Sequence, residues 1–176
     1  MPPLDSSPDA RLIVVMRHAK AESWGESDQE RRLAEKGRAD AAAAGRWLAE
    51  RGFTPDHALV SSATRTQETW GAVAEGAGWS ISPVFEDGLY SAGPDTALDL
   101  MRETPAEARS LLVIGHNPTV AYLAQMLDDG EGDPAAIVDM AGGYPTCALT
   151  VLTFHGSWGD LAMASASVTA FHVGRD

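Results

Sequence analysis

The stretch Leu12-Ile13-Val14-Val15-Met16-Arg17-His18-Ala19-Lys20 decides the fold, because five apolar residues run without interruption into an arginine and a histidine. A continuous apolar run of this length is typical of a strand that is buried on both faces of a parallel sheet. In open α/β sheets, ligands bind at the carboxyl ends of the strands. The run therefore predicts a central strand, with a candidate site where it ends.

Strands and helices are expected to alternate along the rest of the chain. Helices are predicted over residues 33–51, 64–77, 96–102 and 119–127, and strands over residues 57–62, 81–85, 110–114, 146–154 and 167–173. The helix at 64–77 is predicted to be capped by Ser61 or Ser62, and residues 86–95 are predicted to form a loop. The alternation favours a three-layer α/β/α sandwich with a mainly parallel sheet and an antiparallel C-terminal strand. Residues 1–11 are predicted to be a flexible N-terminal tail, and residues 12–176 a single domain.

Composition narrows the class of protein. The 176 residues are 44% hydrophobic and 22% charged, as is usual for one soluble domain. A net charge of −12 argues against binding to nucleic acid or to anionic membranes, so an anionic ligand would need a local cationic pocket. The single cysteine, Cys147, excludes an internal disulfide and fits a reducing, cytoplasmic compartment. Neither a signal peptide nor a transmembrane run is recognisable, and the oligomeric state is left open.

Three predicted strand ends carry cationic or imidazole side chains. The first strand ends in Arg17-His18, the second leads into Arg65 in the first turn of a helix, and the fourth leads into His116 before another helix. Because the carboxyl ends of parallel strands lie at one edge of a sheet, we expect these groups to converge. Helix N-termini favour anions, and arginine binds phosphate through two parallel hydrogen bonds. The pattern predicts a phosphate site.

At these residues the sequence resembles the histidine phosphatase superfamily, and within it the small SixA-like phosphohistidine phosphatases. Four motifs, together with a Pro-Thr pair near a closing strand, carry the resemblance in matching order over residues 12–155. They are Arg17-His18-Ala19; Asp28, Arg32, Leu33 and Gly37; Ser61, Ser62, Arg65, Thr66 and Thr69; Gly115-His116-Asn117-Pro118; and Pro145-Thr146. The resemblance implies a phosphoglycerate mutase-like fold.

The resemblance also implies a mechanism. His18 would attack phosphorus and form a transient phosphohistidine, while Arg17, Arg65 and His116 would hold the phosphoryl oxygens. Water would then hydrolyse the intermediate, with no metal and no other cofactor required. Tight metal-ligand spacings such as His-Glu-x-x-His are absent from the sequence.

The substrate and the general acid are less well defined by the sequence. Glu86 and Asp87 follow the third predicted strand, where larger family members carry an acid, but their surroundings match the family pattern poorly. The loops are too short for an enclosing lid, which favours phosphohistidine presented by another protein. The alternatives are a phosphomonoester phosphatase acting on a small phosphorylated metabolite, and a non-catalytic phosphate-binding module of the same fold.

Three further residues have two interpretations each. Arg32 either lines the phosphate site or pairs with the acidic loop before it. Trp24 and Tyr90 either flank the mouth of the pocket or pack against the core.

Overall fold

A mixed six-stranded sheet forms the centre of the protein, whose computed structural model describes residue 4 and residues 7–91 and 93–176. The spatial order of the strands is β3-β2-β4-β1-β5-β6. The strands are β1 (Arg11–Arg17), β2 (His57–Ser61), β3 (Val84–Glu86), β4 (Ser110–Gly115), β5 (Ala148–Phe154) and β6 (Ala166–Val173). The helices are α1 (Glu35–Glu50), α2 (Thr64–Ala77), α3 (Gly88–Ser91), α4 (Pro94–Arg102), α5 (Thr119–Leu127) and α6 (Pro134–Gly142), with a 3₁₀ turn at Trp158–Asp160.

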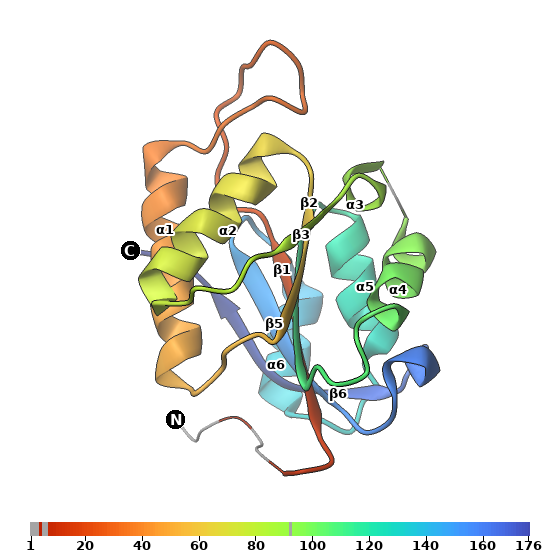
Figure 1. Cartoon of the computed structure of the whole chain (residues 1–176). Helices are drawn as coiled ribbons and strands as arrows, with labels where there is room; N and C mark the ends of the chain where they lie inside the picture. Colours follow the sequence, from red (N-terminus) through yellow and green to blue (C-terminus); the bar gives the residue numbers. More distant parts are fainter. Residues whose placement is uncertain (1–3, 5–6, 92) are drawn as a thin grey trace.

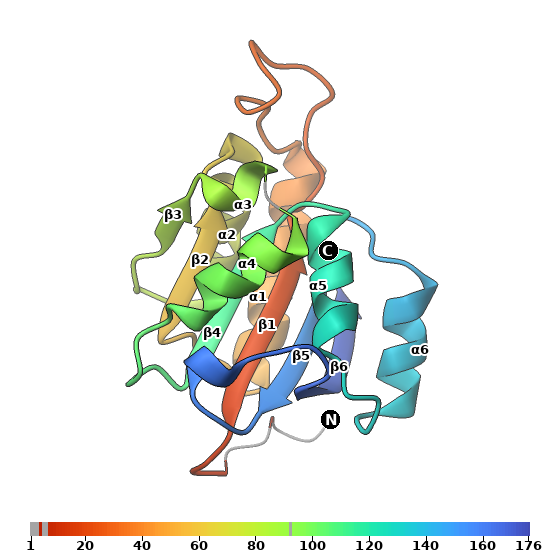
Figure 2. The same ribbon diagram turned by 90° about the vertical axis from the view of Figure 1, so that its right-hand side faces the viewer.

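The sheet is parallel from β3 through β2 and β4 to β1, and β5 then runs antiparallel to β1. The last strand, β6, pairs antiparallel with β5, as the short connection between them predicts. Helices α1 and α2 cover one face of the sheet, and α4, α5 and α6 cover the other (Figures 1 and 2). The predicted three-layer sandwich is confirmed, with β5 as the strand that opposes the others.

The apolar run of the first strand is buried on both faces, as predicted. Ile13 and Val15 pack in the cluster beneath α4 and α5, while Val14 and Met16 pack in the cluster beneath α1 and α2. All four side chains are completely buried. Because successive side chains of a strand point to opposite faces, an unbroken apolar run is the pattern that a sheet covered on both sides requires.

Several predicted boundaries differ from the structure. Residues 1–3 and 5–6 of the predicted tail lie outside the described residues, and β1 begins at Arg11. The loop predicted at 86–95 contains the short helix α3, and β3 is shorter than the expected strand. Helix α6 was not predicted, although Asp133 caps it by accepting a hydrogen bond from the backbone N–H of Ala136 at 2.8 Å. The Asp133-Pro134 pair is a helix-start signal that sequence analysis missed.

Helices α1 and α2 approach each other so closely that glycine is required at both sides of the contact. A Cβ atom on Gly45 of α1 would lie 2.1 Å from the carbonyl oxygen of Val73, and one on Gly76 of α2 would lie 2.2 Å from that of Ala42. Both obstacles are backbone atoms, which cannot rotate away. This contact holds α2, and with it the helix start that follows β2, against the sheet.

We predict that Gly45→Ala lowers the free energy of unfolding by about 1 to 3 kcal/mol, because the helices must separate to admit the methyl group. Gly71→Ala is the matched control, since a Cβ on this exposed glycine of α2 meets nothing within 4 Å. It should leave stability unchanged or raise it by up to about 1 kcal/mol. Urea unfolding of both variants measures the difference, and equal stabilities would contradict the close approach.

Candidate active site

The carboxyl ends of three parallel strands meet at one edge of the sheet and form the candidate site. β1 ends at Arg17, which pairs in register with Gly115 at the end of β4. β2 lies on the other side of β4 and ends at Ser61. The backbone N–H of His18 donates to the carbonyl oxygen of Gly115 at 3.0 Å, so two of the strand ends are joined directly. The structure thus brings together the strand ends that the sequence singles out.

His18 lies at this edge with 8% of its surface exposed. Its ring Nδ1 lies 2.7 Å from the carbonyl oxygen of Ala19. Because a carbonyl oxygen only accepts, this contact selects the tautomer with the proton on Nδ1 and leaves the lone pair on Nε2. Burial lowers the pKa of His18 from 6.5 to about 4, and the Arg65 and Arg17 cations act in the same direction. The imidazole is therefore neutral at pH 7, the form that a nucleophile needs.

The chain just after His18 is fixed by α2. The backbone N–H of Ala19 donates to Oγ1 of Thr69 at 3.0 Å, and this hydroxyl donates to the carbonyl oxygen of Arg65 at 2.7 Å. Ala19 is completely buried, which explains why a small residue follows the histidine. The carbonyl that orients the His18 ring is therefore held by the same helix that carries Arg65.

His116 faces His18, with the two ring centroids 5.3 Å apart. Its Nε2 lies 2.7 Å from Oγ of Ser61. This serine does not cap α2: the N-cap of that helix is Ala63, without a side-chain cap, so the prediction of a Ser61 or Ser62 cap is wrong. The hydroxyl of Ser61 is engaged with the imidazole at the site instead. Burial lowers the pKa of His116 from 6.5 to about 3, with the Arg65 cation as the next cause.

Two arginines complete the arrangement. The guanidinium of Arg65, which is 6% exposed, donates through Nη1 to the carbonyl oxygen of Asp28 at 2.8 Å and through Nη2 to its carboxylate at 3.2 Å. Arg17 donates through Nη1 to the carbonyl oxygen of Tyr144 at 3.1 Å. Asn117 donates to the same carbonyl at 2.8 Å, so the segment before β5 orients side chains from both β1 and the β4–α5 turn.

Three buried nitrogen atoms of this site have no hydrogen-bond partner within the described part of the chain. They are Nε of Arg17, Nε of Arg65 and Nδ1 of His116. Buried polar atoms of native proteins are nearly always paired, and an unpaired one carries a free-energy cost of about 1 to 3 kcal/mol. These three nitrogens belong to the residues that the sequence predicts as phosphate ligands, and an anion that reached them would satisfy them.

Asp28 and Tyr90 lie next to Arg65: Asp28 contacts the guanidinium, and Tyr90 contacts Asp28. The sequence motifs include Asp28 but do not show these contacts. The hydroxyl of Tyr90 donates to Oδ2 of Asp28 at 2.7 Å, and Nε of Arg31 donates to Oδ1 at 3.1 Å. The Tyr90 hydrogen bond is the main cause that lowers the pKa of Asp28 to about 2, with the Arg65 and Arg31 cations contributing. The Tyr90 ring also packs edge-on against His116, at 5.7 Å between centroids, so Tyr90 does flank the site.

The structure tests the two interpretations that the sequence allowed for Arg32 and for Trp24. Nε of Arg32 donates to the carboxylate of Glu68 in α2 at 2.9 Å, so its partner is neither the phosphate site nor the acidic loop before it. Its neighbour Arg31 reaches toward the site instead, which the motif did not reveal. Trp24 is 75% exposed and is not packed in the core.

The two weak candidates for the general acid lie beside the site without contacting its side chains in the described structure. Glu86 ends β3, and its carbonyl oxygen accepts from the backbone N–H of Ser62 at 3.3 Å. Asp87 is exposed, and its carbonyl oxygen accepts from the N–H of Tyr90 at 3.0 Å. Both residues therefore position backbone around the site, and neither carboxylate makes a hydrogen bond or ion pair there.

The described residues contain no group of three or more histidine, cysteine, aspartate or glutamate side chains placed to hold a metal ion. In the same part of the chain, no helix is both long and apolar enough to cross a membrane.

Comparison with known proteins agrees with this geometry. A model of the histidine phosphatase superfamily (branch 1) matches residues 13–90. A solved structure from Nakamurella multipartitia, named for phosphohistidine phosphatase SixA, is 32% identical, spans 94% of this chain and 96% of its own, and has a TM-score of 0.83. This chain belongs to the histidine phosphatase superfamily.

Two curated relatives extend over almost the whole chain. An uncharacterized protein of Mycobacterium tuberculosis is 34% identical over 162 residues, which are 91% of this chain and 100% of the relative. The phosphohistidine phosphatase SixA homolog of Haemophilus influenzae is 28% identical over 164 residues, 88% of this chain and 95% of its own. The protein is accordingly a SixA-like phosphatase with a phosphoglycerate mutase-like fold.

We predict that the rings of His18 and His116 stay neutral down to about pH 5 in the phosphate-free protein, because burial lowers their pKa values to about 4 and about 3. In the unfolded chain, histidine titrates near pH 6.5. As the pH falls from 6.5 toward 4, the unfolded state therefore takes up protons first, and stability that is present above pH 6.5 is lost.

NMR titration of the ring nitrogens tests this prediction, with the chain unfolded in urea as the control. Midpoints near pH 6.5 for both rings in the folded protein would contradict it.

Proposed function

We propose that the protein hydrolyses phosphohistidine in a protein substrate through a phosphohistidine intermediate on its own His18, without a metal ion. The observation that carries the proposal is the lone pair on Nε2 of His18 beside three unpartnered nitrogens of Arg17, Arg65 and His116. A nucleophile and unsatisfied donors at one buried edge are what phosphoryl transfer requires.

The first half-reaction transfers the phosphoryl group to the enzyme. Nε2 of His18 attacks phosphorus, a new P–N bond forms, and the P–N bond to the substrate imidazole breaks. Arg17, Arg65 and His116 donate to the phosphoryl oxygens and offset the charge on them in the transition state. The other ring nitrogen of the substrate carries a proton taken from solvent, so the group that leaves is a neutral imidazole and neutral histidine is released.

The second half-reaction restores the enzyme. Water attacks phosphorus, the P–N bond to His18 breaks, and inorganic phosphate leaves. The proton released by water ends on the phosphate or in solvent, so His18 returns to its neutral tautomer. The Ala19 carbonyl holds the ring orientation through both steps, because it accepts from Nδ1 throughout.

The carboxylates around the site favour a phosphoramidate over a phosphoester. The pKa of Asp28 is lowered to about 2, so this carboxylate carries no proton at neutral pH. A phosphoester needs a proton on its leaving alkoxide, whereas a phosphohistidine whose other ring nitrogen is protonated releases neutral imidazole, a far weaker base. The alternative, a phosphomonoester phosphatase acting on a small metabolite, would require a protonated side chain near the leaving group.

We predict that His18→Ala reduces phosphate release from phosphohistidine by at least about 1,000-fold, because no other side chain replaces the nucleophile. The variant should also lose acid-labile labelling by a radioactive phosphodonor, while its circular dichroism spectrum is unchanged. His155→Ala is the matched control, since His155 is an exposed histidine beyond the end of β5. Full turnover by the His18→Ala protein would refute the assignment of the nucleophile.

We further predict that dialysis against EDTA leaves the rate of phosphate release unchanged within about twofold, because the arginines supply the positive charge that a metal would otherwise provide. Rates are compared before and after dialysis, with and without added Mg²⁺ or Zn²⁺. A loss of activity that either metal restores would show that the reaction depends on a metal ion.

A further inference from the structure

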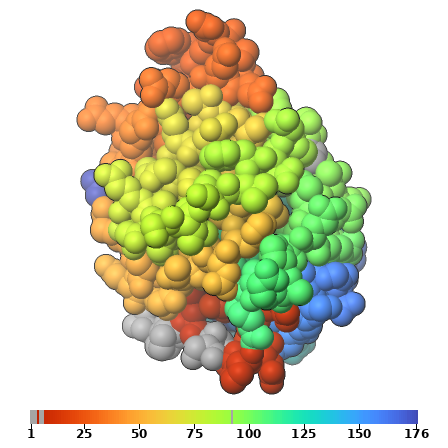
Figure 3. Space-filling view, in the orientation of Figure 1, coloured from red at the N-terminus to blue at the C-terminus, as the bar shows by residue number. Residues whose placement is uncertain are grey.

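The loop at residues 22–32, here called the projecting loop, stands out from the edge of the sheet at which His18 lies (Figures 1 and 3). Its base is closed by a bridge between Ala21 and Leu33 and by a hydrogen bond from Glu22 N–H to the carbonyl oxygen of Arg32 at 2.8 Å. Inside the loop, Arg31 donates through Nη1 to the carbonyl oxygen of Glu22 at 3.0 Å. These contacts hold the loop in one conformation, although residues 23–30 are all exposed.

The projecting loop is attached to the phosphate site itself. The carbonyl oxygen and carboxylate of Asp28 both accept from Arg65. The backbone N–H of Thr64, at the start of α2, donates to the carbonyl oxygen of Gln29 at 2.9 Å. The projecting loop therefore connects Arg65 with the outer surface that carries Trp24.

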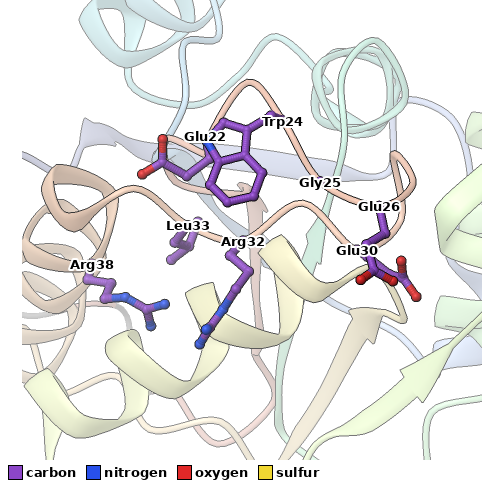
Figure 4. Close-up of a pocket in the computed structure, with 8 residues that line it drawn as sticks. All are labelled: Glu22, Trp24, Gly25, Glu26, Glu30, Arg32, Leu33 and Arg38. Carbon is purple, nitrogen blue, oxygen red and sulfur yellow. The ribbon is translucent and has the colours of Figure 1, made fainter.

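The outer part of the loop displays Trp24 over a cavity of about 490 Å³ (Figure 4). The cavity is lined by Glu22, Trp24, Gly25, Glu26, Glu30, Arg32, Leu33 and Arg38. Trp24 has the largest exposed fraction, 75%, of the exposed large hydrophobic side chains in the described structure. An exposed tryptophan beside a cavity is typical of a binding surface, because its burial by a partner removes a large apolar area from water.

The unpaired charge around the cavity is negative. Glu22, Glu26 and Glu30 make no side-chain ion pair or hydrogen bond within the described residues. The two cations of the lining, Arg32 and Arg38, share one carboxylate, since each lies 2.9 Å from an oxygen of Glu68. Together with Glu68, the three free carboxylates outnumber the two guanidiniums by four to two.

We propose that this cavity binds a lysine or arginine side chain of the phosphoprotein substrate, close to its phosphorylated residue. The cation would lie against the face of Trp24 and pair with a free carboxylate of the lining, where cation–π attraction and ion pairing act together. The proposal rests on the proposed function and adds the feature by which the protein substrate is selected. An acidic segment is the opposite possibility, and it would have to displace Glu68 from Arg32 and Arg38.

Four substrates separate these cases. Three are peptides of equal length with one central phosphohistidine, flanked on each side by two arginines, two glutamines or two glutamates. The fourth is phosphoramidate, which is too small to reach the cavity. For the wild-type protein we expect kcat/KM to be about tenfold higher for the arginine peptide than for the glutamine peptide. The ratio should decrease as salt is added, because the carboxylates are exposed.

Two variants test the residues that are responsible. Trp24→Ala, and the double variant Glu26→Gln with Glu30→Gln, should each bring the arginine-to-glutamine ratio close to 1 while phosphoramidate hydrolysis stays within about twofold of wild type. Met163→Ala is the matched control, because Met163 is 72% exposed and lies away from the projecting loop. It should keep the wild-type ratio.

The outcomes separate the docking proposal from the proposed function. If the wild-type protein releases phosphate from neither phosphoramidate nor any peptide, the proposed function fails. If it hydrolyses the peptides with equal kcat/KM, prefers the glutamate peptide, or keeps its arginine preference in Trp24→Ala, the cavity does not bind a cationic side chain and the docking proposal is overturned.

Discussion

The parallel register of β1 with β4, and of β4 with β2, is the constraint on which the site depends. Arg17 lies opposite Gly115 because β1 pairs with β4 from Leu12 to Arg17. A slip of one residue would turn every side chain of β1 to the other face. That slip is opposed by four completely buried side chains, two on each side of β1. Hydrophobic burial on both faces therefore determines where His18 lies.

The charges at the carboxyl edge of the sheet follow from the way in which the strand register places the site residues. Two imidazoles and two guanidiniums are brought together where water is mostly excluded, and burial lowers the pKa of both histidines so that their rings are neutral at pH 7. Unpaired buried nitrogens cost stability in the ligand-free protein. The rest of the fold offsets that cost, and a phosphoryl group would satisfy the same atoms. The Tyr144 carbonyl accepts a hydrogen bond from Arg17, and Asp28 accepts one from Arg65. Both guanidiniums are therefore oriented in the ligand-free protein.

The projecting loop contributes Asp28 to the candidate site, where it contacts Arg65. It follows β1 and His18 in the chain, contacts Arg65 through Asp28, and leads into α1. In the first turn of α1, a Cβ on Gly37 would lie 2.1 Å from the carbonyl oxygen of Lys20. The glycine of the motif is thus needed so that α1 can pass close to the start of the loop. One segment of chain in this way links His18, Arg65 and the exposed surface that carries Trp24.

The sequence by itself determined the central strand, the layer architecture and the strand ends that carry His18, Arg65 and His116, because burial periodicity and motif order are local properties of the chain. It did not determine which side chains pair across loops. Arg31 rather than Arg32 reaches toward the site, and Ser61 meets His116 instead of capping α2. Such pairings depend on the distance between segments far apart in sequence, which only tertiary packing sets. The exposure of Trp24 was decided in the same way, since an apolar residue in a loop is buried or displayed according to the path of the backbone around it.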